Sequence, residues 1–350
     1  MRAVACVLIC AVLSGCSTAG YYGHVTAGQV SLLTHRKSIA KIVADPSTDA
    51  TLRARLAGTQ EARRFASDRL GLPRNQSYTT YVELDRPYVT WNVFATPEFS
   101  VDPVTHCFPF AGCVAYLGYF ERDRADQEAA RLAAQGNDIS VEGAAAYSTL
   151  GWFADPVLSS MLRWSDDELD GVIFHELAHQ RVYVKDDTAF NESFATFVQE
   201  EGLREWRVIR GLAPADSSER AHDDAFTALV LDLREQLRAI YAREISPDEK
   251  REAKRAAFED FRERYRRLRD TDWGDDHRYD RWVDAPINNA RLVPFGLYDR
   301  WVAAFARLFA ESGPDWTAFY ASVAKLGQLN KSERDSRLQA LLDTPIQRAE

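Results

Sequence analysis

The sequence predicts an α+β fold that is predominantly helical and contains a small β-sheet. Helical periodicity of the apolar residues and helix-capping motifs cover most of the chain. β-branched and aromatic residues concentrate between residues 76 and 125, as expected for strands. With 46% hydrophobic and 11% aromatic residues, the 350-residue chain can bury a substantial core. Because no repeat or low-complexity tract divides the sequence, we expect residues 16–350 to form one integrated unit.

The first fifteen residues are predicted to be a lipoprotein signal that is removed. Arg2 precedes an apolar run over residues 4–13 that is too short to cross a bilayer, and small residues precede Cys16. This pattern resembles the lipobox of bacterial lipoproteins, in which the cysteine is acylated. We therefore predict lipidation of Cys16 and attachment to a bacterial envelope membrane, and Ser17 favours the outer membrane, facing the periplasm. An ordinary cleaved secretory signal is the alternative.

Residues 16–75 are predicted to form N-terminal helices. Apolar positions recur with helical spacing from about residue 29 to residue 70, and Pro46 breaks this segment. In the strand-rich region 76–125, the runs 88–94 and 114–120 are the strand candidates.

Two cysteines of this region, Cys107 and Cys113, remain after removal of the signal and lipidation of Cys16. An even pair of cysteines in an oxidising compartment predicts a disulfide. Two buried free thiols are the alternative.

Residues 126–210 are predicted to carry two consecutive helices, over about residues 166–182 and 188–203. Ser165 and Glu168 form a capping box, in which each side chain accepts a hydrogen bond from a free backbone N–H group of the first turn. The segments that lead to these helices are predicted as a helix (122–135), a brief strand (139–141) and a loop (147–156).

Residues 211–350 are predicted to form a charged helical hairpin followed by closing helices. The hairpin covers residues 225–269 and turns at 246–249, where a second capping box has proline at the first helical position. We expect a solvated helical pair, with a partner-binding coiled coil as the alternative. The closing helices are predicted over residues 282–308 and 316–342.

The charge balance excludes nucleic acid as an expected partner. The chain has 43 basic and 52 acidic residues, a net charge of −9, and the two signs are interleaved. Such a surface repels a phosphate backbone.

The residues that indicate chemistry are His175-Glu176-Leu177-Ala178-His179, an HExxH motif on the capped helix. Residues four apart lie on one helix face, so both imidazoles can bind a single zinc ion. The intervening Glu176 is placed to act as the general base toward a water molecule at the open coordination position.

A catalytic zinc site needs a third protein ligand, and Glu192 on the next predicted helix is the best candidate. Asp186, Asp187 and Glu200 are also acidic and close in sequence, and they are candidates for holding a ligand imidazole in its tautomer. The expected cofactor is one Zn²⁺ ion.

The HExxH helix followed by Asn191-Glu-Ser-Phe-Ala195 resembles the gluzincin metallopeptidases. Over most of the mature chain, the sequence resembles a family of bacterial predicted zinc aminopeptidases with lipoprotein signals. The segments that carry this second resemblance are Trp91–Phe99, Cys107–Cys113, Tyr147–Phe153, His175–Gln180 and Asn191–Phe197. It implies peptidase activity and a zincin-like core with a small sheet over the HExxH helix.

A zincin-like core implies an edge strand that pairs with extended substrate, and a donor for the oxyanion of the tetrahedral intermediate. Residues 114–120 are the first candidate for this strand and residues 91–94 the second. Tyr147 and Tyr298 are the leading donor candidates, followed by Tyr183.

The sequence thus predicts zinc-dependent hydrolysis of peptide or protein substrates by an aminopeptidase. Glu98, Asp186 and Glu200 are candidates for binding a free α-amino group. An envelope endopeptidase and a non-catalytic, chaperone-like peptide-binding lipoprotein are the alternatives.

Overall fold

The computed structural model describes residues 20–108, 112–149, 151–214, 217–274, 276–298 and 300–343, with the side chains of residues 217 and 296–298 excepted. In the described residues, the first half of the chain begins with a helix over residues 20–34 and contains every strand. Its other elements are β1 (Lys37–Ser38), α2 (Ile39–Ala44), α3 (Ala50–Asp68), β2 (Thr80–Val82), β3 (Thr90–Pro97), β4 (His106–Phe108), β5 (Gly112–Val114), β6 (Tyr116–Tyr119), α4 (Arg122–Ala133), β7 (Asn137–Ala144) and β8 (Val157–Leu158).

The second half is helical. It comprises η1 (Met161–Arg163), α5 (Asp166–Arg181), α6 (Thr188–Ile209), α7 (Ser217–Tyr241), α8 (Pro247–Asp272), α9 (Asp280–Asp284), η2 (Asn289–Leu292), α10 (Val293–Tyr298), α11 (Val302–Glu311), α12 (Trp316–Gly327) and α13 (Lys331–Asp343). The expected fold class, α+β with a predominance of helix, is confirmed.

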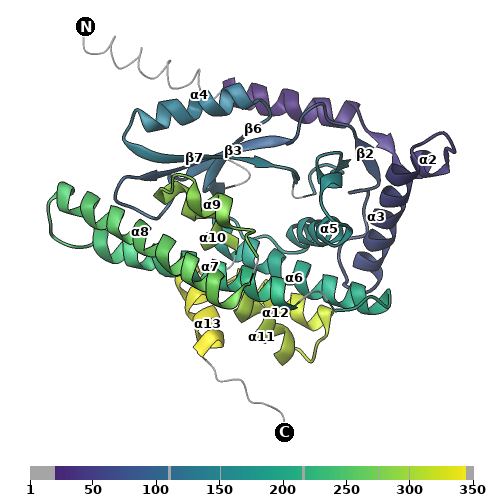
Figure 1. The fold of residues 1–350 in the computed structure, drawn as a ribbon. Coiled ribbons are helices and arrows are strands. Elements are labelled where there is room, and N and C mark those ends of the chain that lie inside the picture. Colours follow the sequence, from purple (N-terminus) through teal and green to yellow (C-terminus); the bar gives the residue numbers. More distant parts are fainter. Residues whose placement is uncertain are drawn as a thin grey trace, which may run out of the picture.

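The main sheet has the strand order β6-β3-β7, and both pairings are antiparallel. One face packs against α4, with Val93 and Leu117 in the same buried cluster as Leu132 of that helix. The other face carries Phe94 and Tyr116, which lie opposite each other in the register and pack against Val293 of α10. The sheet therefore lies between α4 on one side and the helical half of the chain on the other (Figure 1).

A second small sheet, of order β1-β2-β8, connects the N-terminal segment to the chain that leads into α5. β2 pairs antiparallel with β1 and parallel with β8. Because β8 is followed by η1 and then by Ser165, the N-cap of α5, this sheet fixes where α5 begins.

The capping boxes expected at the starts of α5 and α8 are both confirmed. The hairpin of α7 and α8 is also formed, and it has its own aromatic cluster around Phe226, Phe261 and Tyr265. The prediction of one helix over residues 282–308 and one over residues 316–342 is wrong in detail. Each is divided, the first into four short elements and the second between Gly327 and Lys331.

Two other predicted boundaries also differ. The first helix starts at residue 20, not near residue 29, and it ends before the short strand β1. Helix α6 runs to Ile209, six residues beyond the expected end. Its last turns are held by burial of Trp206, whose indole N–H donates a hydrogen bond of 2.8 Å to the Asp170 carboxylate on α5.

Asp170 makes the stability of the α5–α6 pair dependent on pH. Burial raises the pKa of this carboxyl from 3.8 to about 7, although the Trp206 hydrogen bond opposes the rise. Since the folded state retains a proton that the unfolded state has lost, stability falls as pH rises between these values. Ionisation of Asp170 should then cost roughly 4 kcal/mol above neutrality.

We expect Asp170→Asn to remove most of this dependence of stability on pH, since asparagine can still accept the indole hydrogen bond without titrating. Denaturant unfolding of wild type and variant at pH 5 and pH 8 measures the effect. Asp123→Asn, at an exposed position of α4, is the matched control. A wild-type stability that does not fall from pH 5 to pH 8 would contradict the prediction.

Candidate functional site

The site is built on α5 and α6, which are joined by the link 182–187. The Asn191 side chain holds this link, because its Oδ1 accepts from the Val184 N–H and its Nδ2 donates to the Val184 carbonyl, both at 2.7 Å. Asp187 caps α6 by accepting from the Phe190 N–H at 3.2 Å. The start of α6 is therefore fixed against the end of α5.

A buried ion pair reinforces this start of α6 from a distant part of the chain. The guanidinium of Arg334, on α13, donates to Asp187 Oδ2 from Nε at 2.9 Å and from Nη2 at 2.6 Å. The two side chains are only 4% and 2% exposed, so neither charge is screened by water. Asp187 was a candidate for contacting a ligand imidazole, and here it binds Arg334 instead.

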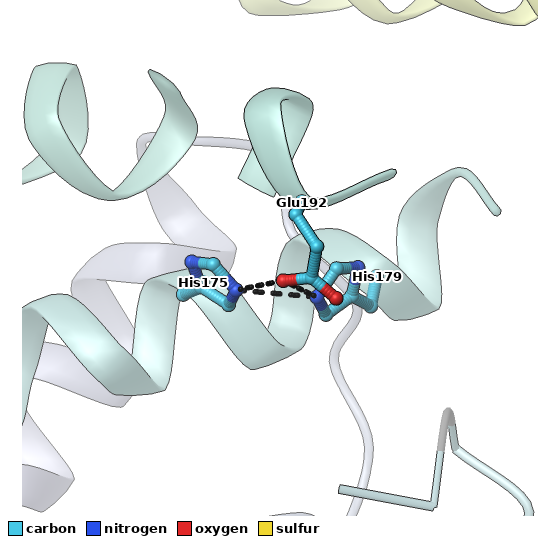
Figure 2. A group of neighbouring side chains, drawn as sticks. All are labelled: His175, His179 and Glu192. Atoms are coloured by element: carbon cyan, nitrogen blue, oxygen red, sulfur yellow. Dashed lines mark hydrogen bonds and ion pairs between the residues drawn. The ribbon is translucent and has the colours of Figure 1, made fainter. Parts of the chain in front are cut away.

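The structure brings His175, His179 and Glu192 together (Figure 2). The two Nε2 atoms of the histidines are 3.2 Å apart. Glu192 Oε2 lies 3.2 Å from Nε2 of His175 and 3.5 Å from Nε2 of His179. Both imidazoles are buried, and the carboxylate is 15% exposed.

This triangle of atoms has the size of one face of a tetrahedral metal site. Two ligand atoms that each lie ~2.0–2.1 Å from a tetrahedral ion are separated by about 3.3 Å. The three measured separations, between 3.2 and 3.5 Å, fit this value. Two imidazole nitrogens and one carboxylate oxygen also form a typical ligand set of a catalytic zinc site. The residues therefore fit one zinc ion with an open fourth position.

The electrostatics of the group follow from its burial. Burial alone would raise the pKa of Glu192, but the attraction of His179 and the hydrogen bond to His175 outweigh it and lower the pKa. Burial opposes protonation of His179, and the Glu192 carboxylate nevertheless raises the pKa of this imidazole. Both shifts favour the charged forms of Glu192 and His179, so a cation that binds here competes with the proton of this imidazole.

Glu176 is half-buried on α5, between the two histidines in sequence. Its carboxylate contributes to the raised pKa of two phenols, that of the buried Tyr78 and that of the partly buried Tyr116, for both of which burial is the largest cause. Glu192 also contributes to the shift at Tyr116. Tyr116, on β6, is therefore close enough to the two carboxylates for their charges to act on its hydroxyl.

Tyr78 and Tyr116 were not recognised from the sequence. Alternation along the run 114–120 could have placed Tyr116 on the same face as Gly118 and Phe120. No local pattern distinguishes Tyr78, which has a positive φ of 61° and is 1% exposed.

The predicted oxyanion donors occupy different places. The ring of Tyr183 lies 6.5 Å from the His179 ring, and this tyrosine is 38% exposed. Tyr147 instead packs edge-on against Phe120, with 5.3 Å between ring centroids, beyond the far end of β6. Tyr298 ends α10, and its side chain lies outside the described residues, as does the whole of Cys16.

The remaining candidate carboxylates already have partners. Glu98 forms an ion pair with Arg251, and Glu200 forms one with Arg220. Asp186 accepts a hydrogen bond of 2.6 Å from the backbone N–H of Cys113. Cys113 is joined to Cys107 by a disulfide between β4 and β5. The disulfide-linked hairpin is thereby attached to the link between the two ligand helices.

The strand that continues from this hairpin is β6, and it lies at the edge of the main sheet. Among the described strands it pairs with β3 alone, whereas β3 has β6 on one side and β7 on the other. Of the two candidate strands for substrate pairing, only the run 114–120 therefore has a free edge.

Comparison with known proteins gives one match. The family model described as "Putative aminopeptidase" matches residues 20–338, which include every residue of the His175, His179 and Glu192 group. No curated protein and no solved structure matches the chain. The match covers most of the chain and supports peptide hydrolysis as its activity. The chain belongs to the family described as "Putative aminopeptidase".

Proposed function

We propose that this chain is a zinc-dependent aminopeptidase of the gluzincin type, with His175, His179 and Glu192 as metal ligands. The observation that supports it best is the triangle of ligand atoms, whose sides of 3.2 to 3.5 Å fit one tetrahedral ion. The zinc ion would polarise the substrate carbonyl and increase the acidity of water.

In this proposal Glu176 is the general base. It follows His175 directly on α5, so its side chain points about 100° around the helix axis from the imidazole of His175. Glu176 takes the proton of the attacking water and passes it to the leaving amine. Tyr183 is the oxyanion donor that the geometry favours, since its ring lies beside His179 and is partly exposed to substrate.

In this proposal, the main sheet and α5 together form a zincin-like core. The free edge of β6 supplies backbone hydrogen bonds to an extended peptide, and β5, which precedes this strand, is held to the link between α5 and α6. Such main-chain pairing does not depend on substrate side chains.

The proposal includes the cellular location of the enzyme. Acylation of Cys16 would anchor the enzyme to the bacterial envelope, at the outer membrane facing the periplasm, where peptides are its substrates and nucleic acid is not a partner. The part of the chain described by the structure contains no helix with the length and apolarity needed to span a bilayer.

The proposal is tested by measuring zinc per chain together with cleavage of a peptide series. The expected result is one zinc ion per chain and hydrolysis of peptides with a free amino terminus, whereas N-terminally blocked copies are cut far more slowly. Equal cleavage of both would identify an endopeptidase. One bound zinc with no cleavage of any peptide would favour the non-catalytic peptide-binding lipoprotein.

A further inference from the structure

The edge of β6 that pairs with no other described strand differs between its two ends. At its start, the preceding strand β5 is held by the hydrogen bond from Cys113 to Asp186, next to the ligand helices. At its end, the edge meets the helix over residues 20–34. In Figure 1 this helix (purple) crosses beside the main sheet, in line with α4.

Two side chains of the helix form hydrogen bonds with backbone groups of β6 and of Phe120, the residue that follows it, and these groups would otherwise be available to a substrate. The Tyr21 hydroxyl donates to the Gly118 carbonyl at 3.3 Å. The backbone N–H of Phe120 donates to His24 Nε2 at 2.9 Å. Burial lowers the pKa of His24, which keeps this ring nitrogen an acceptor, and burial raises the pKa of Tyr21 to about 12, which keeps its hydroxyl a donor.

Close packing holds the helix in this position. The Tyr21 ring lies between the rings of Phe108 and Tyr119, with centroid separations of 5.7 and 5.3 Å. Gly28 lies so close to the Phe120 ring that a Cβ atom at this position would overlap it. The helix therefore covers the edge through both hydrogen bonds and direct contact.

The uncovered part of the edge lies beside the proposed zinc site. Backbone groups of alternate residues in an antiparallel strand point to the same side, so those of Tyr116 share the side of Gly118 and Phe120. Tyr116 lies two residues after the end of β5, and the hydrogen bond from Cys113 to Asp186 holds β5 to the link between α5 and α6. The distance from Tyr116 to the covered carbonyl of Gly118 is about 7 Å along the strand, room for about two substrate residues.

We propose that the helix over residues 20–34 closes the end of the substrate groove that receives the peptide's amino terminus, with Tyr21 and His24 as the specificity-determining residues. The inference rests on the proposed peptidase function. A substrate antiparallel to β6, the more stable pairing, runs from Phe120 toward Tyr116. Its amino-terminal side then meets the helix, and the groove admits only short extensions on that side.

Peptide binding to the zinc-loaded Glu176→Gln variant tests this arrangement without requiring hydrolysis. Three probes share one ten-residue peptide sequence. One is the free peptide, one carries a small folded protein fused at its amino terminus, and one carries the same protein fused at its carboxyl terminus. The fusion at the carboxyl terminus is the matched control for bulk.

We expect the free and carboxyl-fused probes to bind equally, and the amino-fused probe to bind at least about tenfold more weakly. The double change Tyr21→Ala and His24→Ala should recover most of this loss. Gly28→Leu, which forces the helix away from Phe120, should act in the same direction. Val30→Ala, at a half-exposed position of the same helix, should change nothing.

Equal binding of all three probes, binding of none, or weaker binding of the carboxyl-fused probe would overturn the inference. The inference would also be overturned if the ratio of the affinities for the free and the amino-fused probe stayed the same in variants that keep their circular dichroism spectrum and their bound zinc. Should the double change unfold the protein, the single change Tyr21→Ala, which uncovers the Gly118 carbonyl, replaces it. If the wild type binds in the expected pattern but cleaves no peptide, the proposed function fails and the closed groove stands.

Discussion

Replacing Glu176 with glutamine is expected to reduce peptide hydrolysis by about 10²–10⁴-fold while leaving zinc bound. The amide has the size of the carboxylate but cannot accept the proton of the attacking water. The ligand atoms on His175, His179 and Glu192 are untouched by the change, so the metal stays in place. Initial rates on a peptide with a free amino terminus, together with zinc content, measure both halves of the prediction.

Glu252→Gln is the matched control for this experiment. Glu252 is an exposed residue of α8 that pairs with Arg255, and the same chemical change there should leave activity unaltered. Full activity of Glu176→Gln with its zinc retained would remove Glu176 from the mechanism. Loss of zinc from this variant would instead make Glu176 a ligand, contrary to the arrangement proposed here.

Replacing Glu192 with glutamine is expected to weaken zinc binding by about 100-fold or more, and activity should fall with it. The carboxylate oxygen is the only anionic ligand atom in the group, and it lies within 3.5 Å of both imidazole nitrogens. A neutral amide oxygen binds a divalent cation less strongly than a carboxylate does. Even residues that only hydrogen-bond to a zinc ligand change the metal affinity by about 10–100-fold. Competition with a chromophoric chelator measures the change.

Glu201→Gln on the same helix is the control for this second variant. Glu201 forms an ion pair with Arg204 at the surface of α6, away from the histidines. We expect its zinc affinity and activity to match the wild type. If Glu192→Gln bound zinc as tightly as the wild type, the third ligand would have to be another residue, and the gluzincin assignment would fail.

The candidate metal-binding group could be predicted more fully from the sequence than the rest of the fold, because its determinants are local. The capping box at Ser165 fixed the start of α5, and the spacing of His175 and His179 placed both imidazoles on one face. Glu192 followed from the need for a third ligand on a neighbouring helix. The side-chain clamp by Asn191 gave no signal, because it depends on how the link 182–187 folds back.

The strand order and the first helix could not be predicted, because long-range contacts decide them. The runs 88–94 and 114–120 look alike in sequence, yet β3 lies inside the sheet and β6 lies at its edge. The first two turns of the helix over residues 20–34 contain Gly20 and Gly23, which disfavour a helix in isolation. Contacts with β6, ninety residues or more away in sequence, stabilise these turns instead.

The ion pair between Asp187 and Arg334 has a consequence for the order of assembly. Asp187 opens the helix that carries Glu192, and its partner is 147 positions later in the chain. While the nascent protein still lacks α13, this buried aspartate has neither Arg334 nor Lys331 as a counter-charge, so burying it is costly. Maturation of the proposed metal site should therefore be a late, post-translational event, and a polypeptide cut short before Lys331 should acquire metal poorly even though all three proposed ligands are present.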